Sequence, residues 1–292
     1  MPIFTGSGVA MVAAFDKSGI NYDAQGKIIE HLIKGGADAL IVCGTTGEPS
    51  TMTAAEKEEL VRFTIKTVAK RIPVVVGSGG NNTAESIRFS QISQDLGADA
   101  LMVVAPYYNK CTQNGLIAHY SAIAESVKLP IIVYNVPSRT VVDILPSTAA
   151  RLSDIKNLVA LKEASGDIHQ ISEVIRLTKG KMDIYSGDDS LAVPAIALGA
   201  LGVISVAANA VPDKINRMTH LALQGDFKAA AKLHFDLAPL MQLLFCEVNP
   251  IPVKKAMEFL GFATSILRLP LTEMEPQNAA KLKAEMARLK IV

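Results

Sequence analysis

Gly36-Ala37-Asp38-Ala39-Leu40 recurs later in the chain as Gly97-Ala98-Asp99-Ala100-Leu101, and Gly199-Ala200-Leu201-Gly202-Val203-Ile204 is a weaker third copy. In each copy a glycine ends a helical pattern and an apolar run begins, which indicates a helix passing into a buried strand. Between the first two copies lies one more apolar run, Ile72-Pro73-Val74-Val75-Val76. The repeat therefore predicts successive strand–helix units of roughly 30 residues each.

Short apolar runs rich in Val, Ile and Leu alternate with amphipathic helical stretches between residues 8 and 225. The runs are nearly continuous in apolar character, as in strands of a parallel sheet that is covered on both faces. Thr53 with Glu56 forms a capping-box pattern that opens one of the helices, and Asn82 with Glu85 opens the next. The predicted strands span residues 8–15, 38–44, 72–78, 99–106, 130–136, 157–163, 182–187 and 202–207.

Eight such units predict an α/β fold of the (β/α)₈ TIM-barrel type. A doubly wound sheet is the alternative, but it would place a glycine-rich fingerprint after the first strand. Gly77-Ser78-Gly79-Gly80-Asn81-Asn82 instead follows the third strand and lacks the third spaced glycine. After residue 225 only helical patterns remain, over 226–246, 249–261 and 273–290. We therefore predict a barrel over residues 1–225 and a C-terminal helical region over 226–292 that packs directly on it.

The composition excludes several classes of function. The chain has 29 Lys and Arg against 28 Asp and Glu, a net charge of +1, and no Trp. This balance, without basic clusters, argues against binding to nucleic acid or a membrane surface. Cys43, Cys111 and Cys246 form no CxxC pair, which argues against a zinc ribbon or a redox dithiol. With no signal-peptide pattern and no apolar run of membrane-spanning length, we expect a cytoplasmic protein.

Lys162 is the first candidate for chemistry, because barrel active sites form at the C-terminal ends of the strands. It follows the apolar run 158–161. Side chains alternate along a strand, so Lys162 shares a face with Ala160, and Val159 and Leu161 share the other. If the smaller Ala160 faces inward, Lys162 projects into the barrel mouth. Burial there disfavours the ammonium form and frees the amine to attack a carbonyl, whereas a lone lysine at a strand end more commonly reaches water.

Neighbouring strand ends supply further polar groups. Tyr134 lies at the corresponding depth on the adjacent strand and is a candidate proton donor or acceptor, with a core tyrosine as the alternative. Thr45 and Thr46, in Gly44-Thr45-Thr46-Gly47-Glu48, offer hydroxyl and N–H groups that suit a carboxylate, although an ordinary turn also uses such residues. Glu163 points away from the mouth, which favours a structural role.

Metal and phosphate chemistry are not indicated, and we expect neither a metal nor a cofactor. No HxH pair stands at a strand end. Asp188-Asp189 follows the seventh strand, where barrels commonly bind phosphate, and two carboxylates there disfavour a phosphorylated substrate. The five histidines are His31, His119, His169, His220 and His234.

Ordered motifs along nearly the whole chain resemble those of the N-acetylneuraminate lyase family of class I pyruvate aldolases, and within it the dihydrodipicolinate synthases. A single such motif would be weak evidence, but their order on the expected strands makes the resemblance specific. The motifs are Phe4-Thr5-Gly6-Ser7, Gly44-Thr45-Thr46-Gly47-Glu48, Pro106-Tyr107-Tyr108-Asn109, Tyr134-Asn135-Val136-Pro137-Ser138-Arg139-Thr140, Leu161-Lys162-Glu163-Ala164 and Asn249-Pro250-Ile251-Pro252-Val253-Lys254.

The resemblance implies a Schiff-base-forming lyase of lysine and diaminopimelate biosynthesis. The Lys162 amine would condense with pyruvate, and the derived enamine would attack aspartate 4-semialdehyde, giving 4-hydroxy-tetrahydrodipicolinate after cyclisation. Tyr134 would move protons, aided by Thr45 and by Tyr108 contributed across a dimer interface. The implied assembly is a homotetramer built as a dimer of dimers.

Substrate-binding roles are implied in the same way. The N–H groups of Thr45 and Thr46 would hold the pyruvate carboxylate, and Gly187 and Ile204 would line the pocket through their backbone. Arg139 is the discriminator within the family, since an arginine there can bind the carboxylate of the second substrate in a bidentate fashion. The alternative function is a related pyruvate aldolase acting on a sugar acid, of the N-acetylneuraminate lyase type, which is not expected to need this arginine.

A catalytically idle barrel with a binding or regulatory role is a third hypothesis, and the intact set of candidate catalytic residues argues against it. The chain also departs from the family pattern at Ala13-Ala14, Ala105 and Val141, where Thr-Pro, Thr and Gly are usual. None of these changes removes a catalytic group, although the lost hydroxyls could alter packing or rate.

Some members of the family are inhibited by lysine at the dimer interface. Ala54 and Lys57 replace histidines of the sensitive members, and Pro49 replaces a serine. Because a cationic Lys57 repels a cationic inhibitor, we predict weak or absent feedback in an assay with added lysine. Inhibition at submillimolar lysine would contradict this. The candidate residues of such an allosteric site are Ser50, Asn81, Glu85 and Tyr107.

Overall fold

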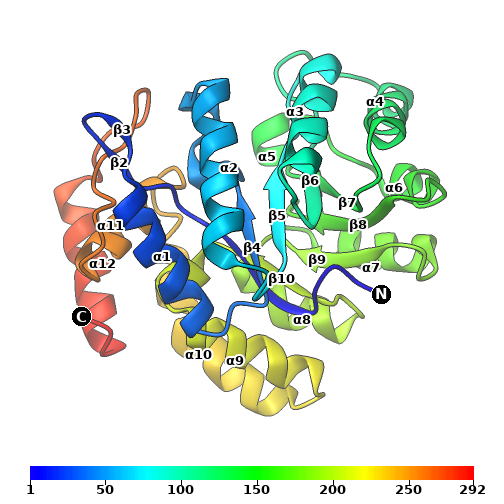
Figure 1. Ribbon diagram of the computed structural model, residues 1–292. Coiled ribbons are helices and arrows are strands. Elements are labelled where there is room, and N and C mark those ends of the chain that lie inside the picture. The colour runs from blue at the N-terminus through cyan, green and yellow to red at the C-terminus, as the bar shows by residue number, and fades with distance from the viewer.

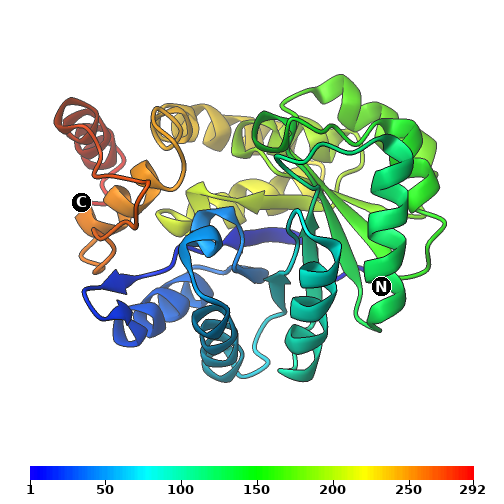
Figure 2. The same ribbon diagram turned by 90° about the horizontal axis from the view of Figure 1, so that it is seen from above.

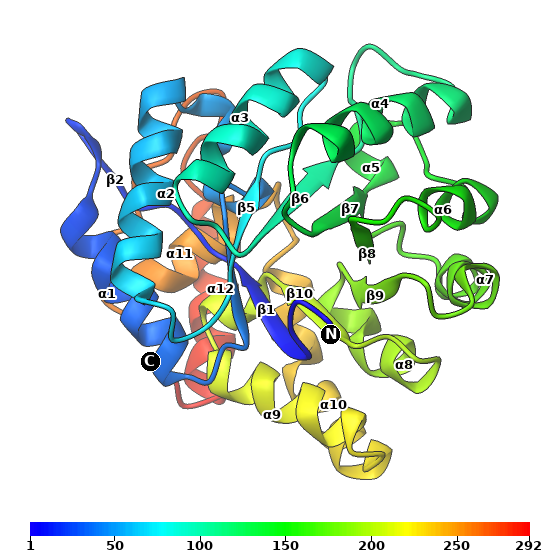
Figure 3. The ribbon, with the colours of Figure 1, turned by 45° about the vertical axis from the view of Figure 1, so that its right-hand side comes forward.

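The computed structural model describes residues 1–292 and contains a closed barrel of eight parallel strands (Figure 1). Each strand pairs with the next along the chain, and the last pairs with the first to close the ring. Figure 3 shows helices surrounding the strands. The barrel strands are β1 (Gly6–Ala10), β4 (Ala39–Val42), β5 (Val74–Gly77), β6 (Ala100–Val104), β7 (Ile131–Asn135), β8 (Leu158–Glu163), β9 (Asp183–Ser186) and β10 (Gly202–Ser205). The TIM-barrel prediction is confirmed, and the doubly wound alternative is wrong.

The first strand differs most from its prediction over residues 8–15. β1 begins earlier and ends at Ala10, and β2 (Phe15–Asp16) pairs instead with β3 (Gly19–Ile20) in a short antiparallel hairpin. Residues 11–14 between them are buried without belonging to a strand. Their apolar character therefore reflects burial in the core, which the sequence pattern cannot distinguish from strand pairing.

The two helices with predicted capping residues begin where the sequence predicts. The Thr53 hydroxyl accepts the N–H of Glu56 while the Glu56 carboxylate accepts the N–H of Thr53, and Asn82 caps the following helix. None of the helices combines the length and the apolar character that crossing a membrane requires. The helices around the barrel are α1 (Tyr22–Lys34), α2 (Ala54–Val68), α3 (Thr83–Asp95), α4 (Gln113–Ser126), α5 (Pro137–Thr140), α6 (Pro146–Leu152), α7 (Ile168–Thr178), α8 (Ala192–Ala197) and α9 (Pro212–Leu223).

Three further helices follow α9, as the patterns after residue 225 predict. They are α10 (Phe227–Leu243), α11 (Ile251–Phe259) and α12 (Pro276–Arg288). Figures 1 and 2 show α11 and α12 on the side of the molecule opposite the N-terminus. Short 3₁₀ turns, η1 (Thr45–Gly47), η2 (Pro49–Thr51), η3 (Asp189–Leu191) and η4 (Ala207–Asn209), follow three of the strands. The division into units 1–225 and 226–292 stays a proposal.

The core has an inner layer inside the barrel and an outer layer between the strands and the helices. Ala160 belongs to the inner layer and Leu161 to the outer one, as the predicted alternation requires. Val159 departs from that prediction, because a β-bulge makes Ile131 pair with Leu158 and Ile132 with Ala160, and Val159 packs against the inner layer. From Ala160 onward the alternation is regular, and Lys162 faces the barrel interior.

A salt bridge between Arg268 and Glu56 ties the segment after α11 to α2. The hydrogen bonds from Arg268 hold the pKa of the Glu56 carboxyl at about 2, well below its usual 4.5. A carboxyl whose pKa is lowered by folding stabilises the fold above its unfolded value, and this contribution is lost as the pH falls through the folded value.

We predict that Glu56→Gln lowers the thermal unfolding midpoint at neutral pH and that the deficit shrinks as the pH falls from 4.5 towards 2. Glutamine also serves in a capping box, so loss of the cap does not contribute. The measurement is a series of melting curves for both proteins across that range. A deficit that is independent of pH would rule out the ion pair as its cause.

Candidate active site

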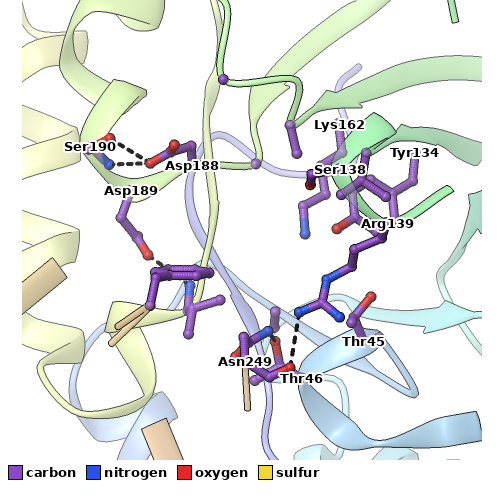
Figure 4. Close-up of a pocket in the computed structure, with 18 of the residues that line it drawn as sticks. Thr45, Thr46, Tyr134, Ser138, Arg139, Lys162, Asp188, Asp189, Ser190 and Asn249 are labelled. Carbon is purple, nitrogen blue, oxygen red and sulfur yellow. Dashed lines mark hydrogen bonds between the residues drawn. The ribbon is translucent and has the colours of Figure 1, made fainter. Parts of the chain in front are cut away.

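A cavity of about 400 Å³ opens where the strands end, and side chains from β7, β8, η1 and α5 point into it (Figure 4). α10 and the segment after it form the opposite wall. None of the five histidines lines this cavity. Its lining includes Thr45, Thr46, Tyr134, Ser138, Arg139, Lys162, Gly187, Asp188, Gln242, Phe245 and Asn249.

Lys162 lies at the base of this cavity, and its side chain is buried. Its Nζ is 4.3 Å from the centroid of the Tyr134 ring, and the two residues are paired in the register of β7 and β8. The only other buried lysine, Lys254, is ion-paired with Glu48, whereas Lys162 has no carboxylate partner. A buried amine that has no carboxylate partner and faces a cavity is placed to attack a carbonyl carbon.

A hydrogen-bonded network on the outer side of the barrel holds these two strand ends together. Asn135 and Glu163 directly follow Tyr134 and Lys162, and the Asn135 amide donates to a Glu163 oxygen at 3.0 Å. The N–H of Ser165 donates to the other oxygen at 2.7 Å. Burial raises the pKa of Glu163, and these hydrogen bonds oppose the rise. Glu163 thus faces away from the cavity, and its contacts support the structural role predicted from the sequence.

Thr45 and Thr46 are the first residues of η1, two residues after the end of β4, so their N–H groups have no partner within that turn. Thr46 is buried, and its hydroxyl accepts a hydrogen bond of 3.1 Å from the Asn249 amide. Free N–H groups at the start of a helical turn favour an anion. The turn therefore presents donors towards the cavity that contains Lys162.

Arg139 lies on α5 and extends across the cavity towards Asn249, as Figure 4 shows. Its guanidinium donates to the Asn249 carbonyl at 3.0 Å. Asn249 contacts both Arg139 and Thr46, but the sequence does not predict it as a site residue. Its side-chain oxygen is buried and has no hydrogen-bond partner. The position of Asn in the motif, directly before Pro250, is the signal that could have identified it.

Of the two residues predicted to line the pocket through their backbone, Gly187 lines the cavity and Ile204 does not. Gly187 lines the cavity, and a Cβ there would lie 2.6 Å from the Ala164 Cβ and 3.0 Å from the Lys162 Cε, so no side chain fits. Ile204 is fully buried in the inner core layer and is not among the residues that line the cavity. The absence of a side chain at Gly187 therefore leaves space for the Lys162 side chain.

The two carboxylates after β9 are both engaged by donors of the chain. Asp189 is buried and accepts the N–H groups of Val206 at 3.0 Å and Ala207 at 2.9 Å. Asp188 accepts the N–H of Ser190 at 2.8 Å. Burial raises the pKa of Asp189. The electrostatic argument against a phosphorylated substrate is therefore weaker than the sequence suggested, and it stays a prediction.

Tyr108 lies outside this cavity, with 92% of its surface exposed and a left-handed backbone (φ 70°). Tyr107 lines a second cavity of about 480 Å³ beside the first, and Thr45, Tyr134 and Arg139 line both. The other candidate allosteric residues, Ser50, Asn81 and Glu85, line the second cavity together with Lys57.

A barrel with a buried, unpaired lysine beside a tyrosine at the strand ends is the arrangement of a Schiff-base-forming enzyme. The chain belongs to the dihydrodipicolinate synthetase family, whose model matches residues 3–289. A protein of Thermoanaerobacter sp. (strain X514) named 4-hydroxy-tetrahydrodipicolinate synthase is 50% identical over 289 residues, which are 99% of this chain and 97% of that protein. A protein of the same name from Lachnoclostridium phytofermentans is 48% identical and covers 100% of both chains.

A solved structure of the family also has the same fold. The chloride-inhibited dihydrodipicolinate synthase of Acinetobacter baumannii, crystallised in complex with pyruvate, is 42% identical and superposes with a TM-score of 0.97. The match covers 99% of each chain. The family resemblance drawn from the motifs is thereby confirmed.

Proposed function

We propose that this chain condenses pyruvate with aspartate 4-semialdehyde through a Schiff base on Lys162, yielding 4-hydroxy-tetrahydrodipicolinate. The observation that carries the proposal is the buried Lys162 amine, unpaired and 4.3 Å from the Tyr134 ring, in a chain whose relatives bear the name of that enzyme. The same names favour this reaction over the sugar-acid alternative. The enzyme is accordingly a lyase of lysine biosynthesis, and we assign it to the cytoplasm.

The proposed chemistry begins with the amine of Lys162. Its lone pair attacks the ketone carbon of pyruvate, and loss of water leaves a protonated imine. Removal of a methyl proton gives an enamine, whose carbon attacks the aldehyde of the second substrate. The amino group of that substrate then attacks the imine carbon, and the bond to Lys162 breaks as the ring closes. The Tyr134 and Thr45 hydroxyls are the cavity groups assigned to carry these protons.

Two sites are assigned to the substrate carboxylates. The N–H groups of Thr45 and Thr46 receive the pyruvate carboxylate, because they begin a helical turn beside the lysine. Arg139 receives the carboxylate of aspartate semialdehyde, because its guanidinium crosses the same cavity. Gly187 leaves space beside Lys162, and Ile204 supports the floor of the site from the core.

The role of Tyr108 requires a second copy of the chain. Its side chain is exposed and outside the cavity of its own chain, which supports a role at the active site of a neighbouring subunit. Val141 and Leu145 follow α5, which carries Arg139, and these exposed apolar residues suit such a contact. We propose self-association as at least a dimer, and as a homotetramer of the dimer-of-dimers type.

The second cavity is the place that we assign to lysine feedback. Ser50, Asn81, Glu85 and Tyr107 line it, and Lys57 lines it with a positive charge. The Lys57 Nζ lies 5.3 Å from the Phe89 ring, which stabilises the ammonium within reach of this space. The charge supports the expectation of weak or absent inhibition by lysine.

Reduction with borohydride in the presence of pyruvate tests the Schiff base. We expect a mass increase on the peptide that contains Lys162, because borohydride reduces the imine to a stable amine. Lys162→Met should yield no adduct, and Tyr134→Phe should lower kcat by about 100-fold or more while the adduct still forms. An adduct on another lysine, or none with the unchanged enzyme, would refute the proposal.

Arg139→Met tests the assignment of the second substrate. We expect kcat/KM for aspartate semialdehyde to fall by about 10- to 100-fold, the loss of one or two charge-assisted hydrogen bonds, while trapping of pyruvate on Lys162 is retained. Steady-state kinetics with varied semialdehyde provide the measurement. Condensation with N-acetylmannosamine is the comparison, and turnover of that sugar in place of the semialdehyde would favour the sugar-acid alternative.

A further inference from the structure

A buried ion pair lies just outside the active-site cavity and joins two distant parts of the chain. Lys254 on α11 donates to Glu48, which follows η1, with an Nζ–Oε1 distance of 2.6 Å. Each side chain is only 1% exposed. Removing two charges from water is costly, and apolar residues of similar size often stabilise a fold as well. Added stability is therefore a weak explanation for this buried ion pair. Its role is better sought in the part of the chain that it holds in place.

The Lys254 amine is held on three sides. Besides Glu48, it donates to the Ile266 carbonyl at 2.6 Å, and it lies 4.5 Å from the centroid of the Phe15 ring. The guanidinium of Arg268 lies 4.2 Å from the same ring. Burial lowers the pKa of Lys254, and the Glu48 carboxylate opposes that change. The ammonium has no freedom to move without losing one of these contacts.

The backbone and the carboxylate of Glu48 are also fixed by several contacts. Its backbone is left-handed (φ 55°, ψ 42°), a conformation that is unfavourable for a residue with a side chain. Its second carboxylate oxygen accepts the N–H of Arg268 at 3.2 Å, and its carbonyl accepts the N–H of Thr51 at 3.1 Å. The contacts to Lys254 and Arg268 therefore fix the point at which η1 passes into η2.

Residues 249–268, here called the C-terminal strap, contact the same turn a second time. The Asn249 amide donates to the Thr46 hydroxyl at 3.1 Å, two residues before Glu48. The strap thus contacts this turn at its middle residue, Thr46, through a neutral hydrogen bond and at Glu48, directly after it, through a charged one. The N–H groups assigned to the pyruvate carboxylate belong to Thr46 itself and to Thr45, the residue before it.

We propose that Lys254 and Glu48 are positioning residues for pyruvate, which set the orientation of the Thr45–Thr46 turn from the C-terminal strap. This inference rests on the proposed function. Donors to a substrate oxygen act at 2.7–3.1 Å, and a displacement of about 1 Å costs roughly 100-fold. The ion pair holds the turn within that tolerance, and neither of its members needs to touch the substrate.

The experiment compares Lys254→Met, Glu48→Gln and the double variant with the unchanged enzyme. We expect each to raise KM for pyruvate by about 10-fold or more, while KM for aspartate semialdehyde changes by less than about twofold. The double variant should be no worse than the more affected single variant, because both remove one interaction. It leaves no unpaired buried charge, so it provides a folded protein if Lys254→Met does not fold.

Lys255→Met is the matched control. Lys255 is the next residue of the same helix, but it pairs within that helix with Glu258 at 2.6 Å. Its loss should leave KM for pyruvate unchanged. If the double variant is less stable but matches this control in KM for pyruvate, the pair is purely structural and the inference fails. If pyruvate cannot be trapped on Lys162 in the unchanged enzyme, the proposed function itself is refuted, whatever the variants show.

Discussion

The parallel pairing of β7 with β8 is the constraint on which the site depends. It places Tyr134 beside Lys162 on the inner face of the barrel and Asn135 beside Glu163 on the outer face. The outer pair is joined by hydrogen bonds and buried, so the register cannot slip without separating a carboxylate from its donors. Tyr134 and Lys162 inside the barrel are thus held in place by Asn135 and Glu163 on its outer face, one residue further along each strand.

Most of the fold could be predicted from the sequence, because strands buried on both faces leave continuous apolar runs and capped helices leave their own signature. The inward direction of Lys162 followed from the small size of Ala160 and the alternation of the strand. The same reasoning failed at Val159, where an extra residue in the strand shifts the pairing, and at residues 11–14, which are apolar because they are buried. Neither feature has a local signature.

Site residues at the ends of predicted strands could be predicted from the sequence. Contacts between segments that lie far apart in the chain could not. Lys162, Tyr134 and Arg139 line one cavity as the motifs implied, whereas Ile204 lies in the core beneath it. The contact of Asn249 with Thr46 joins residues 203 positions apart, and no periodicity links them. Asp189 shows the converse, because its charge was read as facing a ligand although the chain's own N–H groups engage it. Charge type can be read from a sequence, but not the direction of a side chain in a loop.

The C-terminal strap also has a consequence for the order in which the molecule is assembled. The turn that carries Thr45 is synthesised early, but Glu48 finds its partner only when Lys254 has left the ribosome. Until then the left-handed turn lacks its buried counter-charge. A nascent chain can therefore complete all of its barrel strands, the last of which ends at Ser205, before Lys254 is available to pair with Glu48.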